Sequence, residues 1–304
     1  MPAAAAIAAA APDVAVILIV RDPADTPDAV LAALAAQPEA AGFELILADG
    51  RPDATPGQPP GITVIRAPGL NMPLLKARGA AAATARALAF LEPKAVPAPG
   101  WAAALVRARA AAPQAALGGT VRMAGGGSAT DQAAFIFEYA DFSAAQLASG
   151  RAFDLPGNNM VLPRTALLAH CADILATDGL NKPFCQARLV AAGIALRPVP
   201  DMAVAMATSH RLGRLLSSRM RYARCFGGTR VALAPAGRRW RYRLGAPLVP
   251  LLVLARRMGS AGRAATGPRR PGTLPALALL CLAWAAGEIA GYWRGPGGAC
   301  GRLY

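Results

Sequence analysis

The chain has 304 residues, of which 55% are hydrophobic and 16% charged, and 32 basic residues against 17 acidic ones give a net charge of +15. This length and apolar fraction exclude an intrinsically disordered protein and allow one large domain or two small ones. Because only 6% of the residues are aromatic, a carbohydrate-binding module built on stacked rings is disfavoured.

The positive charge is concentrated in the last third of the chain. Residues 1–206 carry 15 basic and 16 acidic side chains, whereas residues 207–304 carry 17 arginines and one acid, Glu288. This asymmetry predicts an anionic partner. Hydrophobic runs rather than aromatic residues interleave with the arginines, which disfavours nucleic acid. We therefore expect anionic membrane lipids as a partner, and no nucleic acid.

Two further features bear on location. The Ala-rich N-terminus has no basic residue before Arg21, so residues 1–12 are predicted to be a disordered tail and not a secretory signal. The cysteines are odd in number, scattered and without a CxxC motif, which predicts free thiols in a reducing compartment and no zinc site. These five residues are Cys171, Cys185, Cys225, Cys281 and Cys300.

The first hundred residues alternate between apolar runs and helical segments. Buried strands are predicted over residues 14–20, 43–49 and 62–67, and helices over residues 26–36 and 72–91. Continuous apolar strands alternating with helices indicate a parallel sheet covered on both faces. Because ligands of such sheets bind at the carboxyl ends of the strands, Asp49 and the later acid Glu92 are candidate site residues.

The pattern continues to residue 206. A helix after Trp101, a strand over residues 116–123, a helix rich in aromatic residues after the glycines 125–127, and a turn entering a strand within residues 153–163 are predicted in that order. A helix ending near residue 176, a short helix over residues 184–193 closed by Gly193, and a strand over residues 196–206 follow.

The basic third is the most apolar part of the chain. Residues 211–226 predict a basic amphipathic helix that lies on an anionic surface or a partner, with an ordinary packed helix as the alternative. Residues 244–255 are too short to span a membrane and fit an interfacial or re-entrant segment. Residues 274–293 match a membrane helix with aromatic residues at one end, and a buried core helix is the alternative.

These segments, in this order, resemble glycosyltransferase family 2, nucleotide-sugar-dependent enzymes of GT-A fold. The resemblance runs from about Val14 to Arg224, and the tail AWAAGEIAGYWRG is similar to that of membrane-attached members. It is carried by VAVILIVRD, FELILADG, LLKARGAAAATARALAFLEP, VPAPGW, LPGNNMVLPRTAL and GLNKPFCQARLVAAGI. We therefore expect an α/β, GT-A-like, mostly parallel sheet flanked by helices over residues 13–209. Basic amphipathic and membrane-associated helices are expected over residues 210–304.

The resemblance implies a set of site residues. A nucleotide-diphosphosugar would contact Asp49, Arg78, Glu92, Lys94, Asn158 and Asn159. A divalent ion, Mg²⁺ or Mn²⁺, would be held by Glu92 and His210, but Lys94 replaces a ligand carboxylate of the family, so weak or absent metal dependence is expected. The segment of the catalytic base carries Asn181 and Lys182, which leaves Asp178 and Lys182 as the catalytic candidates.

Two functions of different kinds follow. The first is transfer of a sugar to a lipid-linked glycan or other cell-envelope acceptor at the cytoplasmic face of the bacterial inner membrane. The second is a catalytically inactive, glycosyltransferase-like binding or scaffold subunit. Donor hydrolysis or transfer by the purified protein distinguishes them.

Overall fold

A computed structural model describes residues 12–52, 60–149, 154–261 and 269–302. Most of the predicted N-terminal tail therefore lies outside the described residues. The centre of the described part is an eight-stranded sheet of order β3-β2-β1-β4-β7-β6-β8-β5. Its strands are β1 (Val14–Val20), β2 (Glu44–Asp49), β3 (Ile62–Arg66), β4 (Ala87–Leu91), β5 (Ala95–Pro97), β6 (Ala116–Met123), β7 (Asn159–Pro163) and β8 (Leu196–Met206).

The sheet is mixed, with parallel pairing in its N-terminal half. Strand β1 pairs in parallel with β2 on one side and β4 on the other, and β3 extends this half in parallel with β2. Strand β7 is antiparallel to both β4 and β6, β8 is parallel to β6, and β5 is antiparallel to β8. The prediction of a mostly parallel α/β sheet flanked by helices is confirmed.

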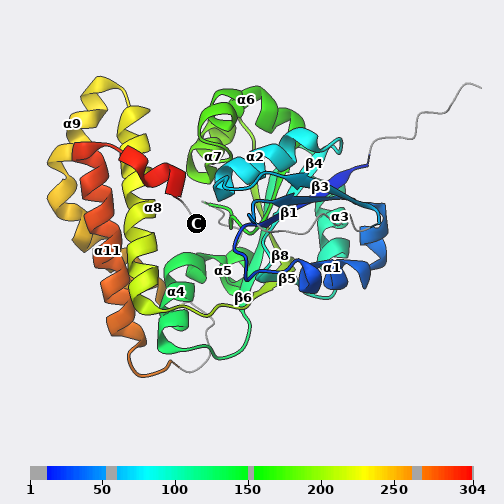
Figure 1. Cartoon of the computed structure of the whole chain (residues 1–304), viewed down its shortest axis with the longest axis horizontal. Helices are drawn as coiled ribbons and strands as arrows, with labels where there is room; N and C mark the ends of the chain where they lie inside the picture. The colour runs from blue at the N-terminus through cyan, green and yellow to red at the C-terminus, as the bar shows by residue number, and fades with distance from the viewer. Residues whose placement is uncertain (1–11, 53–59, 150–153, 262–268, 303–304) are drawn as a thin grey trace, which may run out of the picture.

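Helices cover both faces of the sheet (Figure 1). One face packs against α1 (Asp28–Ala35) and α3 (Trp101–Ala111), and the other against α2 (Met72–Ala82), α6 (Arg164–Thr177) and α7 (Lys182–Ala191). All seven residues of β1 are buried, because its side chains alternate between two covered faces. The carboxyl ends of β1, β2 and β4 are thereby held side by side at one edge of the core.

One predicted element is wrong. The expected helix over residues 72–91 ends at Ala82, and residues 87–91 form the central strand β4. The Glu44 carboxylate accepts hydrogen bonds from the backbone N–H groups of Thr84 and Ala85, at the turn between helix and strand. Pairing of β4 with β1 on one side and with β7 on the other then fixes the ALAFL segment as a fully buried strand.

The C-terminal third forms a helical layer beside the sheet (Figure 1). It consists of α8 (Leu212–Ala232), α9 (Ala236–Leu244), η3 (Ala246–Leu248), α10 (Val249–Ala261), α11 (Thr273–Arg294) and η4 (Gly297–Arg302). This layer packs against α4 (Ala129–Tyr139), which is followed by the 3₁₀ helix η2 (Ala140–Phe142) and the short helix α5 (Ala144–Ala148). The short η1 (Pro38–Gly42) precedes β2.

Helices α8 and α11 approach each other closely through glycines. A Cβ atom added at Gly287 would collide with the carbonyl of Met220, and one added at Gly291 would collide with the backbone of α8. Small residues four apart on one helix permit such contact between backbones. Leu215 and Ala223 of α8 are buried as well, so the predicted amphipathic helix is, along this side, an ordinary packed helix.

Helix α11 is the one helix of the described residues that is long and apolar enough to cross a membrane. Composition and length alone support this, and a soluble core helix passes the same test. Its sides differ: Leu277, Leu280 and Cys281 are fully buried, whereas Leu282 and Trp293 are more than half exposed. Attachment to a membrane therefore stays a prediction.

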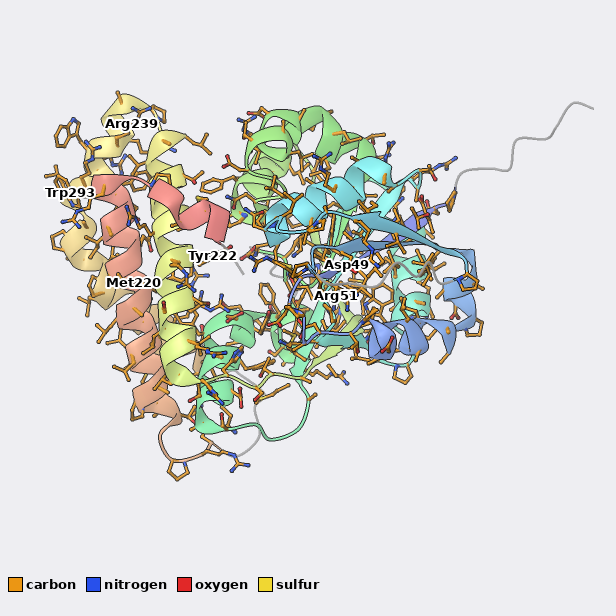
Figure 2. All side chains as sticks on the ribbon, in the orientation of Figure 1. Asp49, Arg51, Met220, Tyr222, Arg239 and Trp293 are labelled. Carbon is orange, nitrogen blue, oxygen red and sulfur yellow. A yellow bond between two sulfur atoms is a disulfide. The ribbon has the colours of Figure 1, made fainter. Side chains whose placement is uncertain are left out.

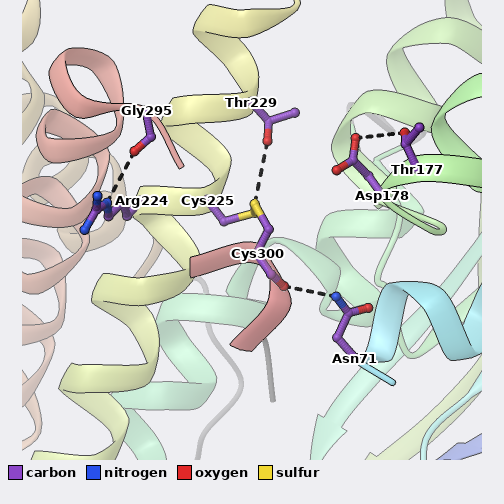
Figure 3. Close-up of a disulfide and its surroundings, with 8 residues drawn as sticks. All are labelled: Asn71, Thr177, Asp178, Arg224, Cys225, Thr229, Gly295 and Cys300. Carbon is purple, nitrogen blue, oxygen red and sulfur yellow. Dashed lines mark hydrogen bonds between the residues drawn. A yellow bond between two sulfur atoms is a disulfide. The ribbon is translucent and has the colours of Figure 1, made fainter. Parts of the chain in front are cut away.

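The prediction of five free thiols is wrong for two of them. Cys225 of α8 and Cys300 of η4 form a disulfide, while Cys171, Cys185 and Cys281 are free and buried. The carbonyl oxygen of Cys300 accepts a hydrogen bond of 3.0 Å from the Asn71 side chain at the start of α2 (Figure 3). The disulfide thus holds the C-terminal turn between the helical layer and the sheet.

Candidate functional site

A cavity of about 1080 Å³ lies between the sheet edge and the helical layer. On the sheet side it is lined by residues that follow β1, β2 and β4, namely Arg21, Asp22, Gly50 and Glu92. On the other side it is lined by α4, α8, α10 and α11. The predicted location of the site, at the carboxyl ends of the strands, therefore coincides with this cavity.

Glu92 lies at the centre of the sheet side. Its Oε1 is 3.0 Å from the ammonium of Lys76, which also donates to the carbonyl of Gly157 at 2.8 Å. This contact arises because Leu91 pairs with Asn159 across β4 and β7, which brings the residues after β4 next to those before β7. Lys76 is 8% exposed, so its charge is held inside the protein beside a single carboxylate.

The other two lysines also line the cavity in ion pairs. Lys94 lies 3.1 Å from Asp25. Lys182 lies 2.6 Å from Asp154 and donates to the carbonyl of Leu155 at 2.7 Å. Burial lowers the pKa of Lys182, although the neighbouring Asp154 opposes this shift. The predicted catalytic candidate Lys182 is therefore in the cavity, as an ammonium paired with a carboxylate.

His210 lines the cavity near these residues. Its backbone N–H donates to Asp131 at 2.7 Å, and Asp131 in turn completes the capping box of α4 with Ser128. Burial lowers the pKa of His210, so the imidazole is neutral at pH 7.

Asp49 is buried and both of its carboxylate oxygens are bound by arginines. Arg51 donates at 2.8 and 3.0 Å, and Arg66 donates at 2.8 Å. Burial alone raises the pKa of Asp49, but these hydrogen bonds and charges hold it below the usual value. Figure 2 labels Asp49 and Arg51 in the sheet domain. Asp49 itself does not line the cavity, whereas Gly50 and Pro52 of the following loop do. Its carboxylate positions Arg51 and Arg66, and a contact of Asp49 with the nucleotide stays a prediction.

The two asparagines of the PGNN turn are buried and do not line the cavity. Asn159 accepts from Trp101 Nε1 at 2.9 Å and donates to the carbonyls of Thr120 and Met202. Asn158 donates to the sulfur of Met206 at 3.2 Å. The Asn159 amide is fully used in joining β6, β7 and β8, so its position does not favour donor binding, which stays a prediction for both asparagines.

Two predicted residues lie outside the cavity lining. Arg78 is exposed on α2, two residues after the buried Lys76 and so on the opposite face of the helix. Asp178 caps the end of α6 and accepts a hydrogen bond from Thr177 (Figure 3). The predictions that Arg78 contacts the donor and that Asp178 acts as base are therefore not supported by their positions.

The residues present do not fit a divalent ion. Within the described residues, no three His, Cys, Asp or Glu side chains cluster, and an ion held mainly by substrate phosphates would still need one or two available carboxylates. Of the two predicted ligands, Glu92 is already bound by the Lys76 ammonium. A cation near Glu92 would be repelled by Lys76, and by Lys94 if it turns inward from Asp25.

Sequence reasoning missed Lys76 and Asp154. Lys76 lies in an Ala-rich helix, and only its partners Glu92 and Gly157, 16 and 81 residues away, reveal its position. A signal was available in composition, since the chain contains 29 arginines but only three lysines. All three lysines line the cavity.

Comparison with known proteins establishes the fold class. No protein-family model and no curated protein matches the sequence. The structure is similar to the mannosyltransferase PcManGT from Pyrobaculum calidifontis in complex with GDP-Man and Mn²⁺, with a TM-score of 0.55 and 14% identity over 93% of this chain and 88% of that one. GalNAc-T7 with UDP, GalNAc and Mn²⁺ gives a TM-score of 0.48 and 11% identity over 65% of this chain and 43% of that one. The chain therefore has a GT-A-like fold, and the first match extends into the C-terminal helices.

Proposed function

We propose that the protein is a membrane-attached glycosyltransferase. It would transfer a sugar from a nucleotide-diphosphosugar to a lipid-linked or other cell-envelope acceptor at the cytoplasmic face of the bacterial inner membrane. The observation that carries the proposal is the confinement of all three lysines to the cavity of a GT-A-like fold. A solved structure of similar fold is that of a mannosyltransferase in complex with GDP-Man and Mn²⁺.

The lysines suit a leaving diphosphate. An ammonium is a compact point charge on a flexible stem, whereas a guanidinium is a planar fork. Lys76 is paired with Glu92 at the carboxyl end of the central strand, and Lys94, two residues after Glu92, is paired with Asp25. The negative charge that develops on a departing diphosphate is stabilised by cations fixed in advance. These two ammonium groups would supply the positive charge that the family resemblance implies for a metal ion.

A catalytically inactive binding subunit is the second candidate. It is favoured by one observation, the absence of a carboxylate at Asn181 and Lys182 where the family resemblance implies the base. Such a subunit would bind the donor, or a partner transferase, without releasing the nucleoside diphosphate.

Calorimetric titration with a panel of nucleotide-diphosphosugars, in EDTA and in Mn²⁺, tests the proposal. We expect at least one donor to bind in EDTA. Lys76→Met should weaken binding at least tenfold, since a charge-assisted hydrogen bond contributes about 1.5–3 kcal/mol. Arg78→Met removes an exposed charge from the same helix and is the matched control.

The outcomes separate the candidates. Binding that disappears in EDTA would refute a metal-independent site. Binding without donor hydrolysis or transfer, in the presence of membrane extracts, would favour the inactive subunit. Equal losses in Lys76→Met and Arg78→Met would mean that the lysine has no specific role. Thermal melts of both variants show whether they are folded.

A further inference from the structure

The cavity continues beyond the lysines into a compartment between α4, α8 and α11. Its wall is aromatic: the ring of Trp284 lies 5.5 Å from that of Phe137, 5.6 Å from that of Tyr222 and 6.0 Å from that of Phe226. All four residues line the cavity, and Figure 2 shows Tyr222 on the side of α8 that faces the sheet domain. We call these four residues the aromatic chamber. Such a surface binds apolar chains.

Positive charge is in excess beside the aromatic chamber. Arg256 and Arg257 of α10 line the cavity, and each lies 3.7 Å from the same oxygen of Asp141. One carboxylate therefore faces two guanidinium groups. Burial lowers the pKa of Arg257, as does the charge of Arg256. An anion bound between the two arginines would relieve both effects, and arginine is well suited to phosphate.

Most carboxylates of the cavity are engaged by cations, and the remaining one, Asp22, accepts a hydrogen bond from the backbone N–H of Ala24. Of the six that line it in the described residues, five form ion pairs. These pairs are Glu92–Lys76, Asp25–Lys94, Asp154–Lys182, Glu138–Arg219 and Glu288–Arg230. A carboxylate stabilised by a cation is a weakened general base. The site therefore suits an acceptor whose attacking oxygen is already ionised.

The compartment borders the outer surface of the helical layer. Leu252 of α10 lines the cavity and is nevertheless 63% exposed. Leu248 and Leu251, on the same segment, are also more than half exposed. A hydrocarbon chain held in the aromatic chamber thus has an apolar route along α10 to the surface.

We propose that the aromatic chamber and the Arg256–Arg257 pair bind the acceptor, and that this acceptor is a lipid phosphate monoester. The inference rests on the proposed function and specifies its acceptor. The hydrocarbon chain occupies the aromatic chamber and leaves along α10, and the phosphate lies against the two arginines, facing the lysines of the donor side.

The transfer step is balanced without a protein base. The second pKa of a phosphate monoester is about 6, so its oxygen is ionised at pH 7. This oxygen forms a bond to the anomeric carbon of the donor sugar. The bond from that carbon to the diphosphate oxygen breaks, and its electron pair leaves with the nucleoside diphosphate. The product is a sugar ester of the lipid phosphate, and no proton is removed from the acceptor.

Binding of farnesyl phosphate to the full chain, below its micellar concentration, tests the proposal. The readouts are calorimetry and the tryptophan fluorescence to which Trp284 contributes. The parent should bind farnesyl phosphate at least tenfold more tightly than farnesol. The double variant R256Q/R257Q should lose this difference. The matched control R211Q/R214Q removes two exposed arginines of the same layer and should bind like the parent.

Phosphatidylglycerol vesicles distinguish an acceptor site from general lipid binding. The affinity for vesicles should fall by a similar factor in both double variants. The affinity for farnesyl phosphate should fall only in R256Q/R257Q. Failure of the parent to bind farnesyl phosphate, equal binding of farnesol, or equal losses in both variants would overturn the acceptor site. Donor binding, measured separately by the nucleotide-sugar titrations, would survive that result. With the bound donor added, a glycosylated product lacking the phosphate would overturn the transfer step.

Discussion

At the scale of single residues, the acid at the end of β2 stabilises the fold through ion pairs. Asp49 is fully buried and its charge is balanced by Arg51 and Arg66. Removing one partner of a buried ion pair leaves the other charges uncompensated and costs about 3–5 kcal/mol. Asp49→Asn should therefore lower the free energy of unfolding by about 3 kcal/mol at pH 7.

The effect of Asp49 should depend on pH with a defined sign. Its folded-state pKa lies below the unfolded value, which is about 3.9. The stabilisation is thus present above the unfolded value and is lost as the pH falls through the folded one. Urea denaturation of the parent and of Asp49→Asn should give a large difference at pH 7 that shrinks below pH about 4. A difference that stays constant with pH would contradict the ion-pair account.

Asn159 tests whether the PGNN turn is structural. Its side chain accepts from Trp101 and donates to two backbone carbonyls, all in the buried centre of the sheet. Asn159→Ala leaves these groups without partners, at about 1–3 kcal/mol for each buried polar group. We expect a loss of about 3 kcal/mol or more by urea denaturation. Donor affinity of the folded fraction should be unchanged, and a loss of affinity without a loss of stability would restore the binding role.

At the scale of elements, the sequence predicted those that depend on neighbouring residues. It did not predict those that depend on contacts between residues distant in the chain. The β-branched run of β1 and the Gly193 end of α7 follow from neighbouring residues. The strand β4 does not, because its Ala-rich sequence favours a helix and only Glu44 and the flanking strands override that preference. The same limit applies to the site, where Lys76 meets Glu92 and Gly157 only after folding.

The disulfide belongs to this scale too, since it joins α8 to η4 across 75 residues. Cross-linking a loop of this length restricts the unfolded chain and stabilises the fold by about 4 kcal/mol in the chain-entropy account. Cys300→Ser should unfold at lower urea concentration than the parent. Dithiothreitol should lower the urea concentration at which the parent unfolds to that of Cys300→Ser, and it should leave the value of Cys300→Ser unchanged. Alkylation of five thiols in the unreduced, unfolded parent would show that the disulfide had not formed.

At the scale of the whole molecule, the large exposed apolar side chains are concentrated in the helical layer, as the arginines are in the last third of the sequence. The sheet domain has few large exposed apolar residues, of which Val106 and Val190 are examples. The helical layer exposes a continuous set on α9, η3 and α10, accompanied by arginines. This set, the α9–α10 face, consists of Trp240, Leu244, Leu248, Leu251 and Leu252. Figure 2 shows Arg239 and Trp293 at one end of the same layer.

Because α8 and part of α11 are packed against the protein, the membrane prediction now depends on this exposed set. An interfacial surface needs apolar residues that enter the lipid boundary and basic residues that meet anionic headgroups. Leu244, Leu248 and Leu251 are between 57 and 75% exposed, and α9 carries Arg238, Arg239, Arg241 and Arg243. We therefore predict that the α9–α10 face, and not the helix over residues 211–226, is the attachment surface.

Flotation with vesicles containing phosphatidylglycerol tests this surface. The parent should float with the vesicles and stay bound at 1 M salt, where the screening length is about 3 Å and surface charge alone no longer holds a protein. Leu248→Glu combined with Leu251→Glu should release the protein at that salt concentration, because two charges would have to enter the lipid boundary. The matched control, Val106→Glu combined with Val190→Glu, places the same charges on exposed apolar positions of the sheet domain and should float like the parent. Release of the parent by salt would mean that its arginines bind the membrane without insertion, and equal release of both double variants would move the attachment away from the α9–α10 face.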